Sequence, residues 1–396
     1  MHRRTVGFFA LAGFFLATTV VAQQVTTGQN ISITVHGIIS GSVFMQDADF
    51  GTGNAQKAEY VTAERNAWVH GGDVRNTRLS LALVGPEVTS GWHANATVEF
   101  DFFGAYSGGG NFGDEQPQPR LRLAYLDLAS ARTTLRIGQD YSPTFATVPQ
   151  STSHIGFPLG WGSGGFIGWR FTQIKLIRTL SHPGAKKTTK LQLAVMNGSW
   201  TDEAGGTNNT FSAGERSAPQ GEARFDYAAG RLAAYIVGHI DTKDFAAGPN
   251  LVSRVLEVGF TTTRGDLSIA ANGHYGKAMG HQFAQVVQFG DIRGWGAWGQ
   301  LGYNLSPHWS VWGFYGAELP NETDMTNNPV TEADGTAIAL ANRRFSSWLT
   351  APMLRYKVGP YALGFEWLHS EVQVGPSANS KLRAGNQVLL SARLDF

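Results

Sequence analysis

The chain has 396 residues, of which 15% are charged, 12% are aromatic and 49 are glycine. An ordinary soluble domain has about 25% charged residues, so this chain carries unusually few charges. The lack of cysteine excludes disulfide frameworks, thiol nucleophiles and cysteine-ligated metal sites. Because 31 Lys and Arg residues nearly balance 30 Asp and Glu residues, the total charge gives no indication of a nucleic-acid partner.

The first 22 residues have the pattern of a secretory signal peptide. Arg3 and Arg4 precede the apolar run TVGFFALAGFFLATTVV, and Val20 and Ala22 occupy the −3 and −1 positions of a cleavage site. The alternative is a retained anchor, but the run of 17 residues is short for a membrane helix of about 20. We predict that residues 1–22 are removed and that residues 23–396 form one domain.

Segments that alternate apolar and polar residues follow, and a period of two is typical of strands with two different faces. Sixteen of them lie near 31–44, 76–86, 90–103, 119–129, 132–140, 166–180, 187–199, 219–228, 231–242, 250–263, 265–277, 292–305, 307–318, 343–357, 360–373 and 385–396. In the third segment, Val98 and Phe100 share one face, and Glu99 and Asp101 share the other. Burying two carboxylates in a dry core would be very costly, whereas a water-filled lumen removes that cost. This pattern favours a barrel over the alternative, a soluble β-sandwich protein.

The connections between these segments alternate in length. Tight turns such as GPEVTSG, SAR, AAGR, TTRGD, SPH and VGP contain the residues that turns prefer. Long connections separate them, at 45–75, 104–118, 141–165, 200–218, 243–249, 278–291, 319–342 and 374–384. Outer-membrane barrels have this alternation, with short periplasmic turns and long extracellular loops. Aromatic residues at apparent outward positions near strand ends suit interfacial girdles: Trp92, Tyr125, Trp309, Tyr315, Trp348, Tyr356 and Tyr361.

The chain ends on NQVLLSARLDF, an amphipathic strand whose last residue is Phe396. Such a strand would leave an exposed, aggregation-prone edge unless another strand covered it. An even number of strands puts both chain ends on the same side, so this strand can pair with ISITVHGIISGS near the start. We therefore predict an all-β fold, a transmembrane antiparallel β-barrel of about 16 strands.

Four stretches, RNTRLSLALVGPE, ATVEFDFFGAYSGGG, PRLRLAYLDL and TLRIGQDYSPTF, resemble the first third of Gram-negative outer-membrane porins, most closely the DcaP-like porins. The resemblance is specific over residues 75–180 and only architectural beyond them. It implies a homotrimer in the outer membrane, surrounded by its lipids, that passes small anionic solutes including dicarboxylates. It also implies that the assembly machinery recognises the C-terminal strand through Phe396. The sequence departs from the family at Tyr141, where Trp is frequent, and lacks the N-terminal coiled-coil extension of some relatives.

The third long connection, DYSPTFATVPQSTSHIGFPLGWGSGG, would fold into the barrel and narrow it if the resemblance holds. Pro143, Pro149 and Pro158, with Phe145 and Phe157, would anchor it against the wall. From the residues alone, a surface loop without a role in selectivity is an equally good interpretation. The residues assigned to the constriction are Asp140, Tyr141, Thr144, Phe145 and His154.

Cationic residues gather at inward positions beside this loop. A guanidinium stays charged and forks onto carboxylates, and the low-dielectric wall of a lumen focuses its field. The alternative is that the arginines pair with acids such as Asp127 and only brace the wall. The predicted pore-lining residues are Arg78, Arg120, Arg122, Arg136, Arg170, Lys175, Glu99 and Asp101.

The sequence indicates no catalytic residues, no cofactor and no metal site. GGGNFG at 108–113 is not followed by a helix, and DADFGTG at 47–53 lacks the later glutamate of a calcium loop. The ten histidines after the signal peptide include no i, i+4 ligand pair. Two other functions stay open: a plugged structural or adhesive barrel, and a barrel hydrolase with His93 and Asp101 as the nearest candidate pair.

Overall fold

The structure, a computed structural model, describes residues 24–26, 31–51, 53, 55–57, 59–104, 106–108, 115–197, 218–243, 251–332 and 336–396. The predicted signal peptide, residues 1–22, lies outside these residues, so its cleavage stays a prediction. Among the described residues, no helix has the length and apolar character needed to cross a membrane.

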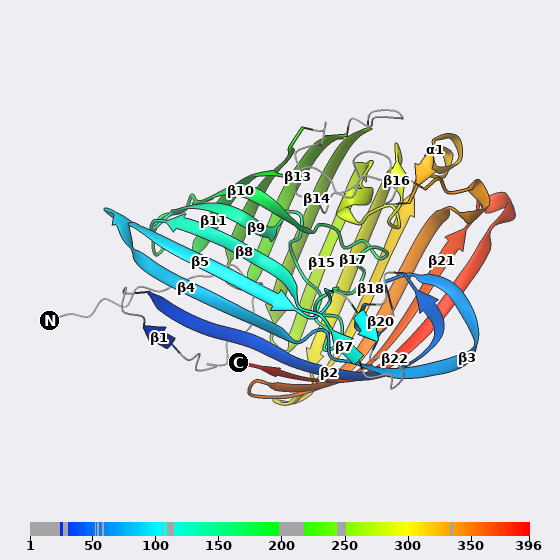
Figure 1. Cartoon of the computed structure of the whole chain (residues 1–396), viewed down its shortest axis with the longest axis horizontal. Coiled ribbons are helices and arrows are strands. Elements are labelled where there is room, and N and C mark those ends of the chain that lie inside the picture. The colour runs from blue at the N-terminus through cyan, green and yellow to red at the C-terminus, as the bar shows by residue number, and fades with distance from the viewer. Residues whose placement is uncertain are drawn as a thin grey trace.

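One antiparallel sheet closes on itself into a barrel (Figure 1). Its strands are β2 (Ser32–Phe50), β3 (Val61–Asp73), β4 (Arg78–Thr89), β5 (Trp92–Asp101), β8 (Arg120–Ala129), β9 (Thr133–Tyr141), β10 (Arg170–Thr179), β11 (Lys187–Met196), β12 (Gln220–Ala229), β13 (Leu232–Lys243), β14 (Leu251–Arg264), β15 (Leu267–Lys277), β17 (Arg293–Asn304), β18 (Trp309–Pro320), β20 (Arg344–Val358), β21 (Tyr361–Val374) and β22 (Lys381–Asp395). Strands β3 and β4 pair with successive parts of β2, so together they occupy one position in the sheet. The predicted barrel of sixteen strands is confirmed.

The last strand pairs with the first, as the C-terminal sequence predicts. β22 and β2 stay in register from Ile38 opposite Asp395 to Gln46 opposite Gln387. At the end of this seam, Gly37 and Phe396 exchange two backbone hydrogen bonds of 2.8 and 3.0 Å. Closure pairs the last strand with the first, and a membrane-spanning wall needs such pairing because lipid cannot hydrogen-bond to a strand.

The connecting segments differ at the two ends of the barrel. The C-terminus and the turn between β20 and β21 lie at one end, and α1 and β16 lie at the other (Figure 1). The connections contain short elements of their own: η1 (Ala55–Lys57), β6 (Tyr106–Gly108), β7 (Glu115–Pro117), η3 (Gly280–Gln282), β16 (Phe289–Gly290), α1 (Glu322–Asn327), β19 (Val330–Thr331), η4 (Leu340–Asn342) and η5 (Ser377–Asn379). Strand β1 (Gln24–Thr26) pairs with the beginning of β2.

The expected first long loop, 45–75, is wrong in extent. β2 continues to Phe50, and β3 pairs with it, so that only a short connection around η1 joins the two strands. Alternation reveals a strand only where its two faces meet different environments. Most of β3 is exposed on both faces, and its sequence, VTAERNAWVHGGD, therefore shows little periodicity.

Large apolar side chains cover the outer face of the barrel. More than half of the surface of each of the following is exposed: Ile39, Leu126, Ile137, Ile174, Leu256, Leu301 and Phe365. Trp309, Tyr315 and Tyr361 are also exposed on this side, as expected for interfacial aromatic girdles. An apolar outer face with charged residues turned inward is the arrangement of a membrane barrel rather than of a soluble one.

Tyr125 does not belong to this outer face, which corrects its assignment to a girdle. It lies opposite Thr97 on β5, and the guanidinium of Arg136 stacks 3.6 Å from the centre of its ring on the inner side. A bulge between β5 and β8, near Glu99, reverses the alternation along β8. Such an irregularity cannot be seen in the sequence of one strand, since it depends on the register of the neighbouring strand.

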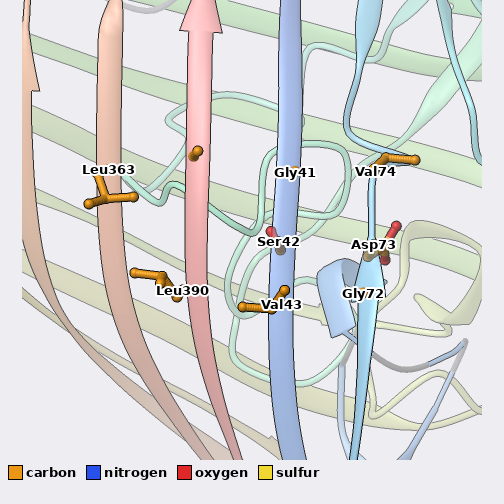
Figure 2. A pocket seen from close by; sticks show the side chains of 9 residues that line it. Gly41, Ser42, Val43, Gly72, Asp73, Val74, Leu363 and Leu390 are labelled. Carbon is orange, nitrogen blue, oxygen red and sulfur yellow. The ribbon is translucent and has the colours of Figure 1, made fainter.

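A shallow groove follows the outside of the seam (Figure 2). Its lining residues include the apolar Val43, Leu363 and Leu390 and the polar Ser42 and Asp73. Val43 is 60% exposed, which places the groove on the membrane side of the wall. The groove therefore opens toward the membrane rather than into the lumen.

We expect Gly37→Ala to destabilise the closed barrel. An added Cβ at Gly37 would overlap the Phe396 ring and lie 2.7 Å from the carbonyl oxygen of Arg78. Overpacking of this kind costs about 1–3 kcal/mol. The change can be measured as the free energy of unfolding in urea, with the folded fraction checked by the mobility of unheated samples on gels.

Gly41→Ala is the matched control for that experiment. Gly41 lies four residues further along the same face of β2, where an added Cβ would meet nothing within 4 Å. Equal stability of the two variants would contradict the proposed role of the contact between Gly37 and Phe396.

Candidate functional site

The segment between β9 and β10, residues 142–169, folds into the barrel and crosses its lumen. Its hydrogen bonds reach four separate parts of the wall: Asn76 between β3 and β4, Glu222 on β12, Gln300 on β17 and Glu366 on β21. These strands are far apart around the barrel, so only a loop inside it can touch them all. The predicted inward-folded third loop is confirmed.

Glu366 holds the middle of this loop. One of its carboxylate oxygens accepts hydrogen bonds from the backbone N–H groups of Thr152 and Ser153, both at 2.8 Å. The other accepts the Ser151 hydroxyl at 2.6 Å. Hydrogen bonds to an ionised group are stronger than neutral ones, so this buried carboxylate is a firm anchor.

Glu222 holds the beginning of the loop in the same way. Its carboxylate accepts the backbone N–H of Thr144 at 2.9 Å and the Thr144 hydroxyl at 3.1 Å. Two residues away on the same face of β12, Arg224 donates to the carbonyl oxygen of Pro143 at 2.9 Å. Sequence reasoning did not single out Glu222 or Glu366. Both are polar residues at inward strand positions, and that is the only sequence signal that could have found them.

The far part of the loop packs through aromatic rings. Trp161 stacks on Trp169 with ring centres 4.3 Å apart, and Phe166 lies against Trp298 of β17. These rings belong to a buried apolar cluster that also includes Phe314. The expectation that aromatic residues anchor the loop fits this packing, which occupies part of the lumen.

The residues assigned to the constriction lie in three different parts of the structure. Asp140 and Tyr141 form the end of β9 and belong to the wall, whereas Thr144 and Phe145 begin the loop. Phe145 stacks on Tyr141 with ring centres 4.1 Å apart. His154 is buried inside the loop, and this burial lowers its pKa, so its neutral imidazole adds no charge to the lumen.

The first group of cations forms an ion-pair network on β4, β5 and β8. Arg122 bonds Glu99 at 2.7 Å and Asp101 at 2.6 Å. Arg120 bonds Asp101 at 2.7 Å, and Arg78 lies 3.6 Å from Glu99. The five residues all face inward, and most of their charge is compensated within the network.

A second network lies next to it on β8, β9 and β10. Arg136 bonds Asp127 at 2.7 Å and Asp140 at 2.8 Å, and Lys175 bonds Asp140 at 2.5 Å. The predicted pairing of arginines with Asp127 is therefore present. These bonds brace three neighbouring strands against one another.

Arg170 lies where the loop returns to the wall, and it is buried between aromatic rings. Its guanidinium stacks on Trp169 at 4.1 Å and lies 5.7 Å from the centre of the Tyr141 ring. Among the described residues, no carboxylate lies within ion-pair distance of it. Cation–π contacts stabilise such a buried charge. The sequence did not determine the direction of the Arg170 side chain.

The predicted cationic side chains differ in how accessible they are to a solute in the lumen. Only 1% of the Arg122 side chain is exposed, against 17% for Arg78, 22% for Arg120 and 14% for Arg136. Arg122 and Asp101 therefore act within the wall, whereas the other three border the open part of the lumen.

Sequence reasoning missed a basic group on the other side of the seam. Arg355 on β20 stacks 4.9 Å from the centre of the Trp312 ring, and its guanidinium lies 3.4 Å from the side-chain oxygen of Gln150 in the loop. Within the described part of the chain, Arg355 has no salt bridge. Lys357 lies two residues further along the same inner face of β20. Strand parity could have identified both residues, although they lie outside residues 75–180, where the family resemblance is specific.

Comparison with solved structures supports the fold. The outer membrane channel DcaP of Acinetobacter baumannii superimposes with a TM-score of 0.71 at 18% identity, over 94% of this chain and 99% of that one. The anion-selective porin from Comamonas acidovorans gives 0.57 at 14% identity, over 92% and 100% of the two chains. OmpT of Vibrio cholerae in its trimer form gives 0.55 at 11% identity, over 92% and 99%.

No protein-family model and no curated protein sequence matches this chain. At such low identities the likeness establishes the fold and leaves the solute open. The chain has the fold of Gram-negative outer-membrane porins, and the predicted resemblance to DcaP-like barrels and the outer-membrane location are confirmed at that level.

We expect Glu366→Ala to loosen the loop inside the barrel. The substitution removes an acceptor of three hydrogen bonds, and hydrogen bonds to charged groups contribute about 1.5–3 kcal/mol each. If the barrel conducts, the variant should have a larger and noisier single-channel conductance in a planar bilayer.

Glu371→Ala is the control on the same strand. Glu371 lies on the other face of β21 and bonds Trp348 rather than the loop. The anchoring role would be disproved if a folded Glu366→Ala barrel had the conductance and current noise of the unsubstituted protein.

Proposed function

We propose that this barrel is a porin through which small hydrophilic solutes diffuse passively, with a preference for small anions such as dicarboxylates. The observation that carries the proposal is the charge of the wall beside the loop. On β4, β5, β8, β9 and β10, five cations share four carboxylates, and Arg170 adds a sixth cation without an ion pair to any described residue, which leaves two positive charges on these strands. The cations are Arg78, Arg120, Arg122, Arg136, Arg170 and Lys175, and the acids are Glu99, Asp101, Asp127 and Asp140.

A surplus of positive charge in a lumen lowers the barrier for anions. The wall has a low dielectric constant and directs the field into the water-filled space. Arg355 adds to this field from another part of the wall, next to Gln150 of the loop. A solute passing the loop would therefore meet basic groups on more than one side.

The likeness to other barrels supports the same proposal. One barrel of this fold is described as an anion-selective porin and another as an outer membrane channel. Diffusion needs no catalytic group, and we propose that the chain is not an enzyme. The pair that a barrel hydrolase would use, His93 with Asp101, is not formed, because the two residues lie near opposite ends of β5, about 26 Å apart at about 3.3 Å per residue.

The proposal includes a homotrimer embedded in outer-membrane lipids. One neighbour with this fold is a trimer, and the outer face here is broad and apolar. In the proposed assembly route, the machinery binds the C-terminal strand through Phe396 after cleavage at residue 22. The alternative function, a plugged structural or adhesive barrel, has support from the apolar cluster that the loop forms inside the lumen.

We expect Arg78→Gln to weaken anion preference in a folded barrel. Arg78 borders the lumen and is only loosely paired with Glu99, so its removal leaves Arg122 to compensate that carboxylate. One unit charge changes the energy of an ion about 4 Å away by about 1 kcal/mol in water, which corresponds to about fivefold in permeability. The reversal potential in a KCl gradient, with and without succinate, measures the change.

Two variants sharpen that measurement. Arg65→Gln removes a cation of the exposed pair with Asp49 and should leave the reversal potential unchanged. Arg122→Gln breaks a buried network and should mainly destabilise the barrel, by about 3–5 kcal/mol. Cation-selective steps from the unsubstituted protein would refute the anion preference, and a silent bilayer with inserted, folded protein would favour the plugged barrel.

A further inference from the structure

Three side chains that can bind a metal ion converge inside the barrel, near the loop end of β13. His239 and Asp241 lie two residues apart and face inward, whereas Ile240 between them is exposed on the outside. His281 comes from η3, in the loop between β15 and β17, and meets them. The three residues are each at most 5% exposed, and their ligand atoms all lie within 4.8 Å of one another.

The spacing of these atoms fits a tetrahedral metal ion. His281 Nε2 is 3.2 Å from His239 Nε2 and 3.4 Å from the Oδ2 atom of Asp241. Zinc binds imidazole nitrogen and carboxylate oxygen at about 2.0–2.2 Å in tetrahedral geometry, so neighbouring ligand atoms lie roughly 3.3–3.5 Å apart. Two edges of such a tetrahedron are therefore already in place. The alternative to a metal site is a chain of hydrogen bonds from imidazole to imidazole to carboxylate.

The position of Glu222 next to His239 favours a metal ion at this cluster. Its Oε1 atom lies 2.9 Å from Nδ1 of His239, the ring nitrogen that points away from the cluster. A carboxylate that accepts this N–H fixes the tautomer and leaves the Nε2 lone pair free to bind a metal. Ligating histidines in metalloproteins commonly have such a partner, and here the partner is buried and already held by the loop residue Thr144.

We propose that His239, Asp241 and His281 bind one divalent transition-metal ion, with Zn²⁺ as the best fit. Two imidazoles and one carboxylate suit borderline metals, and three protein ligands leave a fourth position for water. The proposal is independent of which solute the barrel admits. The sequence indicated no metal site, because its histidines form no local ligand pair, and the second histidine here comes from a distant loop.

The metal would fix one loop against another. The residue after His281, Gln282, accepts a hydrogen bond of 2.9 Å from the backbone N–H of Gly168 in the third loop. The next residue, Phe283, packs its ring 3.8 Å from the ring of Trp161 in that loop. Tying His281 to β13 would therefore stiffen the contact that supports the third loop.

The test uses the full chain refolded in detergent without a polyhistidine tag. After incubation with Zn²⁺ and dialysis, metal content is measured by elemental analysis and affinity by calorimetry. We expect about one Zn²⁺ per chain and an affinity at least about tenfold lower for His239→Ala, His281→Ala and Asp241→Asn. His182→Ala, in an exposed turn, is the matched control and should bind zinc normally.

A second readout protects the result against misfolded variants. Zn²⁺ should raise the thermal midpoint of the unsubstituted barrel and leave that of a folded His239→Ala/His281→Ala double variant unchanged. If the unsubstituted protein retains no more zinc than this double variant, and zinc shifts neither midpoint, the cluster is a hydrogen-bonded brace and the proposal is wrong.

Discussion

The hydrogen bonds that join β2 to β22 are the constraint on which the rest of the structure depends. A strand in lipid must have every backbone N–H and C=O group paired within the protein, so an open sheet of this size could not cross a membrane. Closure at Gly37 and Phe396 completes the pairing of the last strand with the first. It also sorts the side chains, because a closed wall has one lipid face and one inner face. The inward orientation of Arg78, Glu99 and Asp101 follows from that geometry.

Charged residues on the inner face then have two uses that do not exclude each other. Arg122 and Asp101 are buried in the wall and hold β5 against β8, whereas Arg78 and Arg120 keep part of their surface toward the lumen. A buried pair needs good geometry to offset its desolvation, and here each carboxylate has two cationic partners. These strands carry more cations than carboxylates. The same network therefore braces the wall and contributes positive charge to it.

Residues on the inner face of the wall hold the third loop in position. Glu222 and Glu366 hold its backbone from separate strands, and the ring of Trp161 packs against Phe283 from another loop. Polar anchors fix its position, and apolar contacts fill the space behind it. Changes in the loop around His281 would therefore reach the third loop through Gln282 and Phe283.

The sequence by itself determined the strand count, the pairing of the chain ends and the inward direction of Arg78, Arg122 and Arg136, because each depends only on a local period of two and on turn chemistry. It could not determine the length of β3, since both faces of that strand meet the same environment. Only the tertiary structure decided that Tyr125 faces inward, because a bulge depends on the neighbouring strand. The same is true of the anchoring by Glu366 and of the meeting of His239 with His281. These contacts join residues far apart in the chain, and their distances are set by the closed wall and the folded loops rather than by any local pattern.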